Sequence, residues 1–320
     1  MNTLLLIDNL SNPALLFFVL GMLAVWLKSD LRIPPNSSKF ISLYLLFSIG
    51  FKGGQELAHS NFTWQIIWAI LFGILIASVI PIYSFYILKR KLSIEDSGAV
   101  AAAYGSVSAV TFVTAISFLE LQNLTFSGHM VAVMALMEAP AIVIGVMLIR
   151  FYSEKEENSP KMKNIIGHAF SNGSVLLILG SLVIGLLASE KQALGIKPFT
   201  TDLFKGFLAI FLLDMGIVSG KKLNDFFKNG KFMTMFALFI PLINGCVVAL
   251  LSATITSNQG DRFIFAVLAA SASYIAVPAA MKIAAPKANP GIFLPMALAL
   301  TFPFNITIGL PVYLSIITRT

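Results

Sequence analysis

Long apolar stretches, separated by short polar segments, run through the whole chain. Three of them, 61–88, 97–119 and 232–260, contain no charged residue. Each is at least as long as the roughly 20 residues that a helix needs to cross a hydrocarbon core of about 30 Å. The pattern therefore predicts an all-α membrane protein of about ten transmembrane helices. The spans are expected near residues 12–30, 40–60, 62–88, 96–120, 126–150, 170–189, 202–222, 232–257, 262–284 and 290–318.

The composition excludes a water-facing surface. Only 12% of the residues are charged and 57% are hydrophobic, whereas soluble domains carry roughly 25% charged residues. Basic residues gather in alternate loops, and one set of these loops holds 16 of the 22 Lys and Arg residues. Cytoplasmic loops carry such an excess, so this side is predicted to be cytoplasmic and both termini to lie outside. The formal charge of +7 thus reflects basic loop residues that set the membrane topology, and it does not indicate a nucleic-acid partner.

The two halves of the chain resemble one another. The longest polar connection, within 152–168, separates a first half, 1–151, from a second half, 169–320. An offset of 166 pairs Ile49–Leu57 with Met215–Leu223, Ala101–Ala115 with Val267–Met281, and Glu95 with Asp261, and similar offsets pair 19–22 with 183–186 and Gly145 with Gly309. Because each half has an odd number of spans, we predict two inverted five-helix repeats joined by a cytoplasmic linker, 152–168.

Small and hydroxyl-bearing residues interrupt two of the apolar stretches. One interruption lies at 105–109 and the other at 271–277, just before Pro278. Proline removes a backbone hydrogen bond inside a helix but fits the first turn of a new helix. Two broken helices are therefore predicted. Broken backbone at membrane depth is tolerated only where it is buried in protein or lines a cavity.

The breaks are expected to form a binding site. The second part of each broken helix begins near the membrane midplane, where its free N–H groups and roughly half a positive charge attract an anion. Backbone carbonyls and nearby hydroxyls suit a hard cation such as Na⁺. The candidate substrate-binding residues are Gly105, Ser106, Val107, Ser108, Ala109, Ser271, Ala272, Ser273 and Tyr274. The alternative is that these small residues only let helices pack closely.

Three ionisable residues, Lys52, Glu138 and Asp214, fall inside the predicted spans. Such residues are costly there, by about 2.5 to 3.5 kcal/mol for Lys or Asp at a helix centre. Glu138 is expected beside the first broken helix, to carry a proton, to bind a cation or, the favoured role, to accept hydrogen bonds from broken backbone. Lys52 and Asp214 are expected at a similar depth of about 12 Å, which makes them a candidate ion pair. Asn305 is expected to hydrogen-bond to a neighbouring helix.

Motifs of other functional classes are missing from the sequence. Cys246 is the only cysteine, which excludes a disulfide or a thiolate metal site within one chain. No Gly-x-Ser-x-Gly nucleophile elbow and no Walker-type phosphate loop occurs. The sequence thus predicts neither an enzyme nor a bound cofactor.

Five segments carry a resemblance to a known family. They are Ile49–Gly54, Tyr104–Ser108, Met137–Ala141, Ala269–Tyr274 with Pro278, and Ala288–Pro290. Over nearly its whole length the chain resembles the sodium-dependent bicarbonate transporter family, the SbtA-type permeases best known from cyanobacteria. The resemblance implies five plus five helices, a gate domain, and a core domain whose two broken helices hold bicarbonate and Na⁺. It also implies a homotrimer and an elevator-like movement of the core.

The resemblance extends to single residues. It places Gly105, Ser106, Ser108 and Thr111 in the first half of the site, and Ser271, Ser273 and Ala276 in the second half. The family also has an acid where Glu138 stands, and the candidate cation-binding residues are Ser108, Thr111, Glu138, Ser273 and Ala276. The chain departs from the family at Tyr274, where the family has Asp, and at Ala109, Val110, Ala272 and Ala276, where the family is rich in Ser. These departures leave open another anion, and H⁺ in place of Na⁺.

Together, the residues and the resemblance predict a secondary active transporter in the plasma membrane, the inner membrane in bacteria. The expected activity is sodium-dependent import of bicarbonate or a similar small anion by an elevator-like mechanism. One alternative is transport of another small organic carboxylate with Na⁺ or H⁺ coupling, and the other is a membrane sensor or scaffold that does not transport. Cyanobacterial members have a longer central loop and resemble targets of a PII-like regulator, so the short linker argues against that partner.

Overall fold

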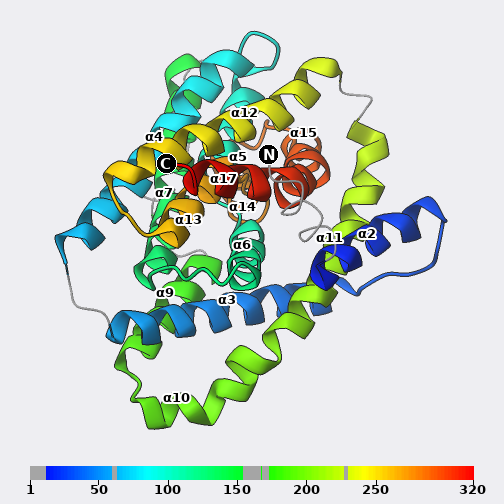
Figure 1. Cartoon of the computed structure of the whole chain (residues 1–320). Helices are drawn as coiled ribbons and strands as arrows, with labels where there is room; N and C mark the ends of the chain where they lie inside the picture. Colours follow the sequence, from blue (N-terminus) through cyan, green and yellow to red (C-terminus); the bar gives the residue numbers. More distant parts are fainter. Residues whose placement is uncertain (1–11, 60–62, 154–166, 168–172, 227–229) are drawn as a thin grey trace.

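The computed structural model describes residues 12–59, 63–153, 167, 173–226 and 230–320 (Figure 1). These residues fold into helices, and no strand occurs among them. Six helical segments are long and apolar enough to cross a membrane: Trp64–Leu88, Ile94–Leu121, His129–Tyr152, Glu190–Leu223, Lys231–Thr254 and Pro290–Ile317. The expectation of an all-α protein with membrane-spanning helices is confirmed. Most of the expected linker, 154–166 and 168, lies outside the described residues.

A helix overlaps each of the ten apolar ranges. In chain order the helices are α2 (Pro13–Trp26), α3 (Pro35–Ala58), α4 (Trp64–Leu88), α5 (Ile94–Gly105), α6 (Ala109–Leu121), α7 (His129–Tyr152), α9 (Gly173–Leu187), α10 (Glu190–Lys197), α11 (Phe204–Phe226), α12 (Lys231–Leu251), α13 (Gln259–Ala270), α14 (Ala276–Ala284), α15 (Pro290–Pro295), α16 (Phe302–Phe304) and α17 (Leu310–Ile317). The pattern missed α10 because this short, polar helix contains no apolar run. A capping box between Ser189 and Gln192 closes its first turn.

The helices fall into two groups. In the paired-helix group, α2 packs along α11 and α3 packs along α9. Glycines permit this close approach, because a β-carbon at Gly21 would clash with the backbone of α11 and one at Gly54 with the backbone of α9. The broken-helix group contains α4, α5, α6, α7, α12, α13, α14 and α17. Figure 1 shows α3 running below this second group and α2 lying to its right, beside α11.

Both predicted breaks are present. Residues 106–108 separate α5 from α6, and residues 271–275 separate α13 from α14. At Ser106 and Ser271 the backbone turns extended, with ψ of 175° and 167°, so the chain leaves the helix instead of bending within it. Pro278 lies in the first turn of α14, where its missing N–H leaves no helical hydrogen bond unmade.

The two broken helices correspond in a register one residue away from the offset found in the sequence. Both ends of α13 lie 165 residues after those of α5, so Ser106 corresponds to Ser271 and Ser108 to Ser273. The second break is longer, however, and α14 begins 167 residues after α6. A single offset of 166 lies between these two values, which is why it paired serines with non-serines.

Candidate functional site

The two breaks contact each other directly. The backbone N–H of Ser108 donates to the hydroxyl of Ser271 (3.0 Å), and the N–H of Ser273 donates to the carbonyl of Ala103 (2.8 Å). The Ser271 hydroxyl in turn donates to the carbonyl of Leu268 (2.9 Å). Each break therefore supplies partners for backbone groups that the other has released from helical hydrogen bonding.

A small cavity lies between the breaks. Its lining residues are Val107, Ser108, Ala109, Glu138, Ser174, Ser273, Tyr274, Ile275 and Ala276. They come from both breaks, from the half-helices that follow, and from α7 and α9. The cavity volume of about 10 Å³ is close to the minimum for one water molecule. Since α9 belongs to the paired-helix group, the cavity lies at the border between the two helix groups.

Two helix N-termini face this cavity. Ala109 and Ala276, the first residues of α6 and α14, both line it. The Ser108 hydroxyl accepts a hydrogen bond from the N–H of Thr111 (3.1 Å), and the Ser273 hydroxyl accepts one from an N–H of α14 (3.4 Å). Each helix N-terminus carries roughly half a positive charge. The cavity is therefore a favourable place for an anion.

Glu138 supplies the one carboxylate among the residues that line the cavity. It is 4% exposed, and its Oε2 has no hydrogen-bond partner among the described residues. The favoured expectation, hydrogen bonds from broken backbone, is wrong for this oxygen because the breaks satisfy each other. An isolated buried carboxylate is costly unless a cation or a proton neutralises it. Its place at the cavity therefore favours the other two roles, binding a cation or carrying a proton.

A family comparison covers the same residues. The sequence model of the Na⁺-dependent bicarbonate transporter superfamily matches residues 13–318, nearly the whole chain. The chain belongs to this superfamily. A comparison with curated proteins gave no match. Membership of a Na⁺-dependent bicarbonate transporter superfamily, together with several apolar helices of membrane-spanning length, identifies an integral membrane protein of a transporter family.

Several residues that the sequence assigned to the site do not line the cavity of this superfamily member. They are Gly105, Ser106, Thr111, Ser271 and Ala272. Gly105 packs against the ring of Pro81 in α4, which leaves no room for a β-carbon. Ser271 bridges the breaks, and Thr111 donates its N–H to Ser108. The contact of Ser271 joins the two breaks, whereas those of Gly105 and Thr111 stabilise the first break alone.

Two lining residues, Ser174 and Ile275, were not among the candidates. Ile275 falls inside the expected break at 271–277, so its position alone was a sufficient signal. Ser174 lies in α9, in the other helix group. No local signal marks it, because its place at the cavity depends on how the two groups pack.

The candidate ion pair between Lys52 and Asp214 does not form. Lys52 Nζ lies 3.7 Å from Glu120 Oε1, and Asp214 accepts a hydrogen bond from the Ser38 hydroxyl (2.5 Å). Ser38 lies in the first turn of α3, whereas Lys52 lies roughly 21 Å further along the same helix. The prediction is wrong because Phe204, at the start of α11, is the residue that lies beside Lys52, whereas Asp214 lies ten residues further along α11, at the Ser38 end of α3.

Polar residues of the last span support the broken helices. Asn305 Nδ2 donates to the carbonyl of Ala270 (2.6 Å), the last residue of α13, and Asn305 Oδ1 accepts from the Tyr313 hydroxyl (2.9 Å). The Thr301 hydroxyl hydrogen-bonds to the hydroxyl of Tyr104 in α5 (2.7 Å). The expectation that Asn305 hydrogen-bonds to a neighbouring helix is confirmed.

An Asn305→Leu variant is expected to be less stable by about 1 to 3 kcal/mol, because it leaves the buried carbonyl of Ala270 without this partner. The midpoint of thermal unfolding in detergent should fall. Thr114→Val is the matched control, since the buried Thr114 hydroxyl donates to the carbonyl of Val110 within its own helix (2.9 Å). Equal midpoints for the two variants would contradict a bracing role for Asn305.

Proposed function

We propose that this protein imports bicarbonate, or a similarly small anion, together with Na⁺ across the plasma membrane, the inner membrane in a bacterium. The observation that carries the proposal is the cavity between the two breaks. Two helix N-termini, the hydroxyl-bearing residues Ser108 and Ser273, and the carboxylate-bearing Glu138 converge there. The superfamily supports both the anion and the coupling ion.

The anion is expected to bind at the N-termini of α6 and α14. Bicarbonate carries one negative charge and presents oxygen acceptors to backbone N–H groups, which is the chemistry that helix N-termini favour. Bicarbonate is larger than water, however, and the cavity has room for about one water molecule. The surrounding helices must therefore separate before the anion enters, and the structure represents a closed state.

Na⁺ is expected to bind on the Glu138 side of the same cavity. Among the described residues, no group of three or more His, Cys, Asp or Glu side chains is placed to hold a metal ion. Na⁺ does not require such a group, because hydroxyl and carbonyl oxygens suit a hard cation. The chain has Tyr274 where the family resemblance has Asp, so Glu138 is the charged ligand in this proposal. With Glu138 protonated in place of Na⁺ binding, the same site would couple to H⁺.

Two matching hydrogen bonds support two inverted repeats of five spans. The excess of Lys and Arg in one set of loops supports a topology with both termini outside. Asp96, in the first turn of α5, accepts from the N–H of Asn289 (2.7 Å), ahead of α15. Asp261, in the first turn of α13, accepts from the N–H of Ser127 (2.6 Å), ahead of α7. In each half, an Asp in the first turn of the broken helix thus accepts a hydrogen bond from the backbone just before the last span of the other half. In this register Asp96, and not Glu95, corresponds to Asp261.

The position of the cavity supports an elevator-like movement. The broken-helix group contributes every lining residue except Ser174 of α9, so the site would travel with that group past the paired-helix group. Separation of the two groups would also open the closed cavity. The family resemblance further supports a homotrimer as the assembly in the membrane. Within each chain, residues 1–151 and 169–320 are the two proposed repeats.

Uptake by purified protein in liposomes tests this function. We expect labelled bicarbonate to accumulate under an inward Na⁺ gradient, and to stop accumulating when a Na⁺ ionophore collapses that gradient. Accumulation of a small organic carboxylate in place of bicarbonate would support the second transporter hypothesis. If no anion enters under Na⁺ or H⁺ gradients, the proposal fails and the sensor hypothesis replaces it.

A further inference from the structure

A second group of charged residues joins the two helix groups away from the breaks. Glu120, at the end of α6, lies 3.7 Å from Lys52 of α3 and 3.2 Å from Lys205 of α11. The broken-helix group is thus tied to two helices of the paired-helix group by one carboxylate. Under the proposed topology, all of these residues lie toward the outside.

Two cavities open beside these ion pairs. The larger, of about 340 Å³, lies between α3 and α10, and the smaller, of about 210 Å³, lies between α3, α6 and α11. Lys52 and Glu56 line both cavities, and Glu120 lines the smaller one. Either cavity is far larger than the closed cavity between the breaks. Space for a small anion therefore already exists here.

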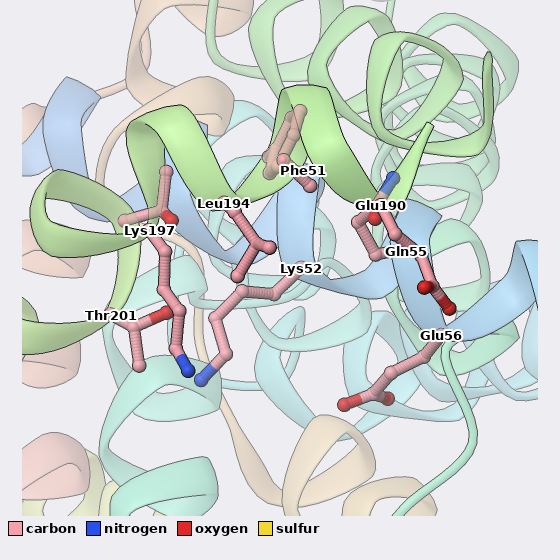
Figure 2. Close-up of a pocket in the computed structure, with 10 residues that line it drawn as sticks. Phe51, Lys52, Gln55, Glu56, Glu190, Leu194, Lys197 and Thr201 are labelled. Carbon is pink, nitrogen blue, oxygen red and sulfur yellow. The ribbon is translucent and has the colours of Figure 1, made fainter. Parts of the chain in front are cut away.

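The larger cavity is lined by two lysines, Lys52 and Lys197, and by two glutamates, Glu56 and Glu190, of which Glu190 lies 3.7 Å from His59. Figure 2 shows the amino groups of Lys52 and Lys197 turned toward one another, with Thr201 beside them. Within the described part of the chain, no carboxylate lies within 4.0 Å of Lys197, and Glu56 also stays beyond that distance from Lys52. Two like charges that face each other repel, and an anion between them removes the repulsion. The arrangement favours a small oxyanion.

The position of Glu120 connects this place to the breaks. Glu120 is near the end of the half-helix that begins at Ala109 in the closed cavity, and the two residues are roughly 16 Å apart along α6. A change of ion-pair partner at Glu120 therefore acts on α6, the same helix whose N-terminus faces the closed cavity. Glu120 is joined to Lys52 of α3 and to Lys205 of α11 by side-chain ion pairs, which can exchange partners without a change in the backbone.

We propose that Lys52 and Lys197 form an outer capture site for the arriving anion, and that the anion displaces Glu120 from Lys52. This inference rests on the proposed function, since it assumes a small anion as substrate. Glu120 acts as an internal competitor that occupies Lys52 while no anion is present. When an anion takes its place, α6 loses its ion pair with α3, and this loss favours movement of the broken-helix group. Capture and release are thereby linked by one exchange of partners.

The two partners of the ion pair give opposite expectations for uptake. Lys52→Gln removes an amino group from the capture site and should raise the KM for bicarbonate about tenfold or more, since a charge-assisted contact is lost. Glu120→Gln removes the competitor and should lower the KM. Lys191→Gln is the matched control, because Lys191 lies on α10 but does not line either cavity. A merely structural ion pair would move the KM of both variants in the same direction, and that result would overturn the proposal.

A labelling experiment tests capture even where transport fails. The purified protein is treated with a lysine-acylating reagent in sodium bicarbonate or in sodium gluconate at the same ionic strength, and the modification of each lysine is quantified by mass spectrometry. Bicarbonate should slow labelling of Lys52 and Lys197 relative to Lys191, and gluconate should not. Equal protection by both anions, or protection of none of these lysines, would overturn the capture site. Protection of Lys52 and Lys197 by bicarbonate without any bicarbonate uptake would support the capture site and contradict only the proposed transport function.

Discussion

A Glu138→Gln variant is expected to fold normally and to lose Na⁺-dependent uptake. The carboxylate is buried with an unpartnered oxygen, so replacing it by a neutral group of the same shape does not break a hydrogen bond to that oxygen. Na⁺ would lose its charged ligand, however, at a cost of about 2 to 5 kcal/mol. That is at least roughly 30-fold in affinity. The measurement is the initial rate of bicarbonate uptake at increasing Na⁺ concentration.

Asp214→Asn is the matched control for Glu138→Gln. Asp214 is also a buried acid within a predicted span, at 6% exposed, but it hydrogen-bonds to Ser38 and does not line the cavity. This variant should keep the Na⁺ dependence of the parent protein. An unchanged Na⁺ dependence in Glu138→Gln would remove Glu138 from the cation site. Equal loss in both variants would show a general effect of buried charge.

Locking the two helix groups together is expected to stop uptake completely and reversibly. A β-carbon at Gly53 of α3 would lie 3.1 Å from the Cβ of Val131 of α7, near the separation that a disulfide needs. The test protein carries Gly53→Cys and Val131→Cys with Cys246→Ser, which removes the only native cysteine. Uptake in liposomes should cease on oxidation and return on reduction, because the broken-helix group can no longer move past the paired-helix group.

A lock within one group provides the control. A β-carbon at Gly220 of α11 would lie 3.1 Å from the Cβ of Val25 of α2, and both helices belong to the paired-helix group. The Gly220→Cys and Val25→Cys protein, also with Cys246→Ser, should transport equally well before and after oxidation. Continued uptake through the oxidised lock between groups would rule out a relative movement of the groups.

The breaks were accessible to sequence reasoning because their cause is local. Glycine, serine and proline within otherwise apolar stretches change the backbone where they stand, so 105–109 and 271–277 could be placed without a partner in view. Asn305 was accessible for a similar reason, since an amide at membrane depth requires a hydrogen-bond partner. The helices of the apolar ranges follow from hydrophobicity alone.

The remaining features depend on contacts between distant segments. Ser174 reaches the cavity only because α9 packs beside the broken-helix group, and its own sequence surroundings are ordinary. The partner of Lys52 could not be found from depth, because two residues at the same depth on different helices need not lie next to each other. Glu120, in α6, is the carboxylate that lies 3.7 Å from Lys52. The offset between the two broken helices was predicted one residue away from its value in the structure because the two breaks differ in length.

A cryo-EM map of the protein in lipid nanodiscs with Na⁺ and bicarbonate would test the central claim most directly. The account predicts that the space between Ser108 and Ser273 opens relative to its present volume of about 10 Å³. It also predicts density for a small anion at the N-termini of α6 and α14, with a cation beside Glu138. An anion bound elsewhere, with the space between the breaks still closed at saturating bicarbonate and Na⁺, would contradict the account.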